Sequence, residues 1–63
     1  MLNSDDIERI LDVADEFGMN LEETDVEKIW SECLRIKGVS DMTLPIDRKE
    51  LADMLQEAVS CVG

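Results

Sequence analysis

The chain has 63 residues, with 16 acidic and 6 basic side chains, no histidine and a net charge of −10. This length suffices for one domain at most, and the charge excludes binding to nucleic-acid phosphates or to an anionic membrane, because both need a basic footprint. Hydrophobic residues make up 44% of the chain, which is typical of a folded domain.

The first predicted element is an amphipathic helix that begins after Asn3 or Ser4, both of which are favourable N-cap residues. Its apolar residues recur at intervals of three and four, the period of an α-helix. They are Ile7, Ile10, Leu11, Ala14 and Phe17. Gly18 follows this stripe and is predicted to end the helix, because glycine adopts the left-handed conformation readily.

A second helix is predicted to begin at Thr24, because Thr24 and Glu27 have the spacing of a capping box. Its apolar residues cover a wider sector than those of the first helix. They are Val26, Ile29, Trp30, Cys33, Leu34 and Ile36. Such a helix contacts two neighbours, or one neighbour and another chain. Gly38 is predicted to end it.

Residues 38–46 are predicted to form an ordered, extended loop packed on the bundle. Apolar side chains alternate with other residues in this segment, namely Val39, Met42, Leu44 and Ile46. Asp47 and Glu50 then have the spacing of a second capping box. A third helix follows, with apolar residues at helical spacing: Leu51, Met54, Leu55, Ala58 and Val62.

Three amphipathic helices predict an all-α fold, a small three-helix bundle that forms a single helical domain over residues 1–63. The core is predicted to consist of Ile7, Ile10, Leu11, Phe17, Val26, Ile29, Trp30, Cys33, Leu51, Met54, Leu55 and Ala58. Cores of this size often supply only about 3–5 kcal/mol of stability. Dimerisation would enlarge the core, so a homodimer stays an open alternative.

The two cysteines, Cys33 and Cys61, are 28 residues apart and too few for a structural zinc site. The start of the chain is acidic and lacks the basic and apolar segments of a signal peptide. No apolar stretch reaches the roughly 18 residues of a membrane span. We therefore expect a cytoplasmic protein with reduced thiols, in which Cys33 is a small buried hydrophobic residue.

Sequence motifs for chemistry are absent. Nucleophilic catalysis needs a base beside the nucleophile, and there is no histidine to serve. Asp12 to Glu23 has the length of a calcium-binding loop, but Ala14 stands at a ligand position and Phe17 where a turn-forming glycine is required. Glycine-rich phosphate-binding motifs are also missing. We predict that the protein is not an enzyme and has no catalytic residues, cofactor or metal.

The acidic side chains are concentrated in the first part of the chain. Residues 1–25 hold nine acids and one base, a net charge of −8, whereas residues 26–63 have a net charge of −2. Eight of the nine form what we call the acidic ridge: Asp5, Glu8, Asp12, Asp15, Glu16, Glu22, Glu23 and Asp25. Such a ridge either keeps the protein soluble or forms a surface for a basic partner.

Our first hypothesis is a small acidic, non-enzymatic binding protein or inhibitor that occupies a basic surface of a protein partner, without direct contact to nucleic acid or membrane. Helical acids four residues apart rise about 6 Å, close to the roughly 7 Å between phosphates along a DNA strand. A phage-type DNA mimic or an anti-CRISPR-like inhibitor would fit this pattern. The alternative is a structural interaction module or homodimer that uses an apolar face around Trp30 and Leu34, because tryptophan is enriched at interfaces.

Overall fold

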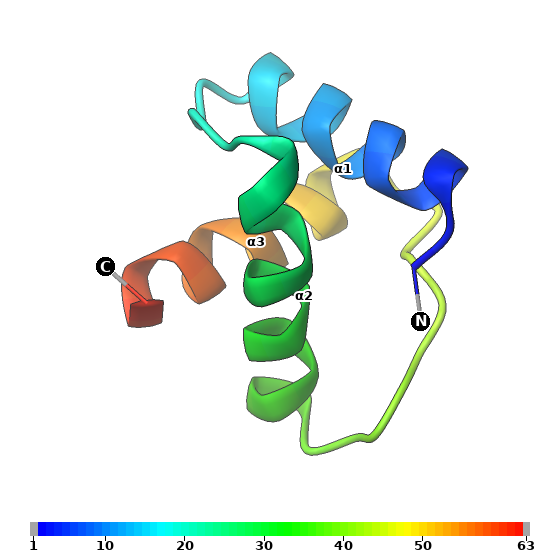
Figure 1. Ribbon diagram of the computed structural model, residues 1–63. Helices are drawn as coiled ribbons and strands as arrows, with labels where there is room; N and C mark the ends of the chain where they lie inside the picture. The colour runs from blue at the N-terminus through cyan, green and yellow to red at the C-terminus, as the bar shows by residue number, and fades with distance from the viewer. Residues whose placement is uncertain (1, 63) are drawn as a thin grey trace.

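The computed structural model describes residues 2–62. Met1 and Gly63, which the single-domain prediction included, lie outside the described residues. Within that range the chain forms three α-helices and no strand: α1 (Ser4–Glu16), α2 (Glu23–Lys37) and α3 (Arg48–Val62). In Figure 1, α3 crosses behind α2, with which it packs most extensively, and α1 lies across the top of the pair. The predicted all-α three-helix bundle is therefore confirmed.

Both ends of α1 are fixed by local hydrogen bonds. The Asn3 side chain accepts a hydrogen bond from the backbone N–H of Asp6 at 2.9 Å, and the Asp6 side chain accepts one from the backbone of Asn3. This reciprocal pair satisfies two N–H groups that the helix leaves unpaired. At the other end Gly18 has a φ of 79°. The N–H of Gly18 donates to the Asp15 carbonyl and that of Met19 to the Ala14 carbonyl, which is the Schellman arrangement.

The start of α2 differs from the prediction. The helix begins at Glu23, and its N-cap is Glu22, whose side chain makes no capping hydrogen bond. The Thr24 capping box is therefore wrong. Leu21 and Val26 occupy the positions of a hydrophobic staple, and both pack into or against the core. Because this pair sets the direction in which the chain enters the helix, α2 begins before the polar capping signal.

The end of α2 follows its sequence signal. The start of α3 follows its signal only in part, because Asp47 caps the helix but no hydrogen bond among residues 2–62 joins Glu50 to Asp47 as a capping box requires. Gly38 has a φ of 73° and its N–H donates to the Arg35 carbonyl. At the start of α3 the Asp47 side chain accepts a hydrogen bond from the N–H of Lys49 at 3.1 Å. An acidic cap also suits the positive end of the helix dipole.

The core is formed by all three helices. Its buried members are Ile10, Val13, Ala14, Val26, Ile29, Trp30, Cys33, Leu51, Ala52, Met54, Leu55 and Ala58. Phe17, predicted to be in the core, is instead 40% exposed. It is the C-cap residue of α1 and lies past the last helical turn. The buried face of α1 consists of Ile10, Val13 and Ala14, with Ile7 and Leu11 only half-buried beside it.

The connector between α2 and α3 packs only in part. Met42 and Leu44 are half-buried against the core, whereas Val39 is 44% exposed and Ile46 is 92% exposed. The predicted burial of Val39 and Ile46 is therefore wrong. An extended chain places only every second residue on one side, which separates Val39 from Met42 and Leu44. The backbone then bends at Ile46 and Asp47 before α3 begins, and Ile46 points outward.

Candidate functional site

Every member of the acidic ridge is exposed, but the structure divides the ridge. Five acids project from the outer face of α1, opposite its buried side: Asp5, Glu8, Asp12, Asp15 and Glu16. Glu22, Glu23 and Asp25 lie at the start of α2. Glu23 and Asp25 are two residues apart, so they point about 200° apart around the helix. Asp25 borders a separate depression together with Lys28. Glu23 instead borders a depression together with Glu8 of α1, so the ridge continues from α1 onto α2 at Glu23 and is broken at Asp25.

Arg48 neutralises part of the α1 face. Its guanidinium donates to Asp12 at 2.9 Å and to Glu16 at 2.7 Å, and both contacts are ion pairs. These hydrogen bonds raise the pKa of Arg48 above its ordinary value. Within residues 2–62, the other six ridge acids have no ion-pair partner. Asp12 and Glu16 thus join α1 to α3, and the remaining six keep their charge available to a partner.

Arg9, the only base in residues 1–25, points toward the connector. Its guanidinium donates to the carbonyl oxygen of Ile46 at 2.7 Å and to that of Pro45. These bonds fasten the end of the connector to α1. Because the acceptors are neutral carbonyl groups, Arg9 cancels none of the ridge carboxylates through a direct ion pair.

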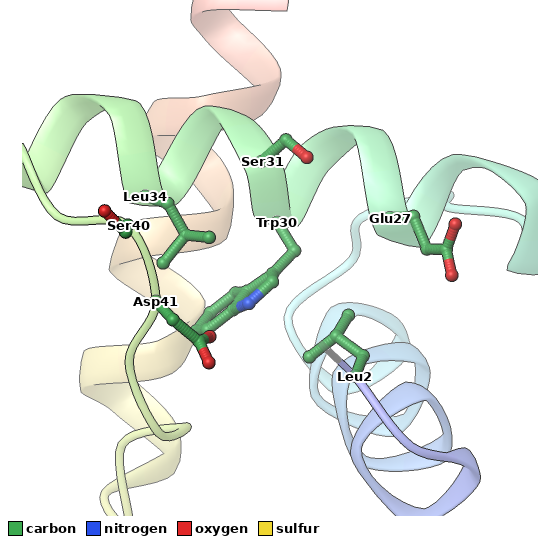
Figure 2. A pocket seen from close by; sticks show the side chains of 7 residues that line it. All are labelled: Leu2, Glu27, Trp30, Ser31, Leu34, Ser40 and Asp41. Carbon is green, nitrogen blue, oxygen red and sulfur yellow. The ribbon is translucent and has the colours of Figure 1, made fainter.

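Trp30 and Leu34, the predicted apolar interface, do not form a protruding face. Trp30 is only 4% exposed and Leu34 is half-buried, so the partly exposed tryptophan that this hypothesis needs is absent. The two side chains instead line a pocket of about 420 Å³ between α2, the connector and Leu2 (Figure 2). The pocket is lined by Leu2, Glu27, Trp30, Ser31, Leu34, Ser40 and Asp41.

Two smaller depressions continue this pocket between α1 and α2. One of about 310 Å³ shares Glu27 with it and is lined by Ile7, Glu23 and Thr24 as well. The other, of about 240 Å³, shares Ile7 and Glu23 and adds Ser4, Glu8 and Leu11. We call the three together the α1–α2 groove. Its floor is apolar and its edges are acidic or carry hydroxyl groups.

Sequence reasoning missed most of this groove. Leu2 lies near the start of the chain and Ser40 and Asp41 lie in the connector, so the path of the connector brings them together. Glu27 carried a usable signal, because it lies three residues before Trp30 and seven before Leu34 and therefore shares their side of α2. That position puts an acid directly beside the edge of the apolar sector.

The two thiols differ strongly in environment. Cys33 is buried, and its Sγ lies 3.5 Å from the carbonyl oxygen of Met54. Burial, with the charge of Glu57 adding to it, raises the pKa of Cys33 to about 11. A thiol with this pKa is almost entirely protonated near neutral pH and is a poor nucleophile. Cys61 is exposed, and both cysteines are free.

In comparisons with known proteins, no family model, curated protein or solved structure matches the chain. Among residues 2–62, His, Cys, Asp and Glu side chains nowhere gather in a group of three or more that could hold a metal ion. The helices in this part of the chain are also too short or too polar to cross a membrane.

Proposed function

We propose that this chain is a small, non-enzymatic acidic binding protein that occupies a basic surface of a protein partner. The observation that carries the proposal is the set of six exposed ridge acids that lack an ion-pair partner within residues 2–62. Three of them, Asp5, Glu8 and Asp15, lie on the outer face of α1. A regular helix fixes the backbone from which these carboxylates project, so little backbone order has to be gained on binding.

The charge also determines how such a complex would form. A molecule with a net charge of −10 approaches a positive cleft faster than a neutral one, and salt screens this attraction. The complex should therefore associate rapidly at low ionic strength and weaken as salt is added. A more specific version of the proposal is an inhibitor that mimics DNA phosphates and blocks a nucleic-acid-binding protein.

The test compares two triple variants that remove the same charge. Asp5→Asn/Glu8→Gln/Asp15→Asn neutralises the α1 face, and Glu50→Gln/Asp53→Asn/Glu57→Gln neutralises three exposed acids of α3. Each set includes one acid in the first turn of its helix. Asp12 and Glu16 stay unchanged because they hold Arg48. We expect a partner captured from a host lysate at low salt to be lost with the α1 variant and kept with the α3 variant.

Identification of the captured protein by mass spectrometry extends this test. A nucleic-acid-binding partner that is displaced by added DNA would support the DNA-mimic version. Equal capture by both variants and by the native chain in high salt would contradict the proposal. Capture of the chain by itself, with a dimer mass in analytical ultracentrifugation, would favour the homodimer instead.

A further inference from the structure

We propose that the α1–α2 groove binds an amphipathic basic helix of the partner. An apolar side chain of that helix would enter the pocket beside Trp30, and its lysine or arginine residues would face the acidic edges. This inference rests on the proposed function and deepens it, since it names the part of the partner that is recognised. The shape and the charge of the groove both support this ligand chemistry, and an unused hydrogen-bond donor marks where the bound helix would place an oxygen atom.

The first support is the shape of the groove. Glu23, Glu27, Trp30 and Leu34 follow one another on α2 at intervals of four, three and four residues, so they form one strip along the helix. From Glu23 to Leu34 the strip is about 16 Å long, which equals about three turns of a helix laid against it. Half-buried Ile7 and Leu11 of α1 form the opposite wall. A helix in this position would become the fourth of the bundle.

The second support is the charge of the lining. Glu8, Glu23 and Glu27 border the groove, and neither lysine nor arginine lines any of its three depressions. The depression on the other side of α2 differs, because Lys28 stands beside Asp25 there. Among residues 2–62, the charged side chains that border this apolar surface are all acidic, which is complementary to a helix with one apolar face and cationic flanks.

The third support is the indole N–H of Trp30. The residue is 96% buried, since only 4% is exposed, and its N–H has no hydrogen-bond partner among residues 2–62. Among the described residues, no side-chain nitrogen or oxygen atom is both fully buried and without a hydrogen-bond partner. Because the indole nitrogen has no partner, it must be accessible, and the pocket that Trp30 lines gives it this access. Figure 2 shows it turned toward the space between Asp41 and Leu2. Lysine and arginine have no acceptor atom, so this hydrogen bond would go to a side-chain oxygen or to one of the free carbonyl oxygens in the last turn of the bound helix.

Other occupants fit the groove less well. A second copy of this chain also has a net charge of −10, so its helices would be repelled by the acidic edges. Nucleic acid and anionic lipid are excluded by the same repulsion. A basic partner segment meets both the apolar floor and the acidic border.

The probe for this proposal is a synthetic peptide of about fourteen residues, or four helical turns. It contains only leucine and lysine, with the leucines at helical spacing. One control peptide has the same composition with leucine at every second position, and another is oligolysine of equal charge. Because Trp30 is the only tryptophan of the chain and the probe has none, a change in its fluorescence reports occupation of the pocket. We expect a saturable change with the helical probe alone.

Matched charge reversals locate the binding site. Glu27→Lys changes the shared edge of two depressions, whereas Glu57→Lys makes the same charge change on α3, outside the groove. We expect Glu27→Lys to weaken binding of the helical probe by about tenfold or more, and Glu57→Lys to weaken it by less than about threefold. Circular dichroism of both variants shows that they stay folded.

The remaining outcomes separate the two proposals. The groove proposal would be overturned if the two charge reversals weakened binding of the helical probe equally, or if oligolysine bound as tightly as that probe. Either result would leave the proposed acidic binding function intact. If the groove is the binding site, Leu34→Ser should weaken binding of the helical probe. The weaker binding of oligolysine should stay unchanged. Absence of binding by every cationic probe at low salt would overturn both proposals.

Discussion

Two glycines set where α1 and α2 end, and their role is conformational. Gly18 and Gly38 have φ values of 79° and 73°, and a Cβ added at either would meet no atom within 4 Å. The space for a side chain is therefore present, but the left-handed backbone disfavours one. Residues with a Cβ lose about 1–2 kcal/mol in this conformation, and asparagine tolerates it better than most.

We accordingly expect Gly38→Ala to lower the free energy of unfolding by about 1 kcal/mol. Gly38→Asn should lower the free energy of unfolding by less, because asparagine tolerates the left-handed region better than alanine does. Urea denaturation followed by circular dichroism would measure both. Equal losses for the two variants would show that Gly38 matters for a different reason.

Cys33 links stability to alkaline pH. Its pKa rises from an ordinary value of 9.0 to about 11 in the folded chain, because the thiolate is disfavoured in the core. The unfolded chain therefore loses this proton first as pH rises. The stabilisation is complete below about pH 9 and is lost as pH increases toward 11.

This sign predicts a decrease of unfolding free energy between pH 9 and 11 that depends on Cys33. In a Cys61→Ser background, Cys33→Ala should flatten that part of the pH profile, although it also lowers stability at neutral pH by leaving a cavity. Urea denaturation at several pH values measures the slope. The same slope with and without Cys33 would contradict this origin.

At the scale of the elements, α1 and α3 are joined by Arg48 through Asp12 and Glu16. We expect Arg48→Met to lower the melting temperature modestly, since the pairs are exposed and exposed pairs contribute little. Asp12→Asn/Glu16→Gln should cause less than additive loss when combined with Arg48→Met, because all three residues form one network. Thermal unfolding of the single, double and triple variants would show this, and strict additivity would argue against a shared network.

The sequence predicts elements best where their signals are local. Asn3, Asp47, Gly18 and Gly38 act on backbone within a few residues, and each lies where its side chain or its φ implies. The start of α2 depends on the hydrophobic staple of Leu21 and Val26, which competed in the sequence with the polar signal at Thr24. Phe17 was misplaced because α1 ends one residue before it, so the helical period no longer sets the direction of its side chain.

In the candidate site too, features set by local sequence were predictable, and features set by tertiary packing were not. Exposure of the five ridge acids of α1 was predictable from the helical period, because they lie opposite the apolar stripe. The meeting of Glu23 with Glu8 was not, since it depends on how α1 and α2 pack. The pocket beside Trp30 requires Leu2 and Ser40 to meet, which is a matter of tertiary structure.

For the whole molecule, the dominant force beyond the core is repulsion among the acids. Sixteen acids oppose six bases, and all three arginines are already engaged. Arg9 binds backbone carbonyl groups, Arg35 pairs with Glu32, and Arg48 pairs with Asp12 and Glu16. Salt screens charges over about 8–10 Å at physiological strength. It should therefore reduce repulsion more than it weakens the few ion pairs.

We expect the melting temperature to rise when sodium chloride is increased from about 0.02 M to 0.5 M. Differential scanning calorimetry measures the change. A variant with three α1 acids neutralised should have a higher melting temperature at low salt, and this temperature should rise less as salt is added. A melting temperature that falls with salt would mean that the Arg48 and Arg35 pairs outweigh the repulsion.

The connector has a consequence for the pocket that it borders. Ser40 and Asp41 supply one wall, yet this segment has neither helix nor strand to order it and is held by the half-buried Met42 and Leu44 and by Arg9. Binding in the pocket and ordering of this wall are therefore coupled. A ligand binds only the conformations in which the wall is formed, and so it increases their population. Amide protons of residues 39–44 would exchange more slowly in a complex, and a substitution at Arg9 would alter affinity without touching the ligand.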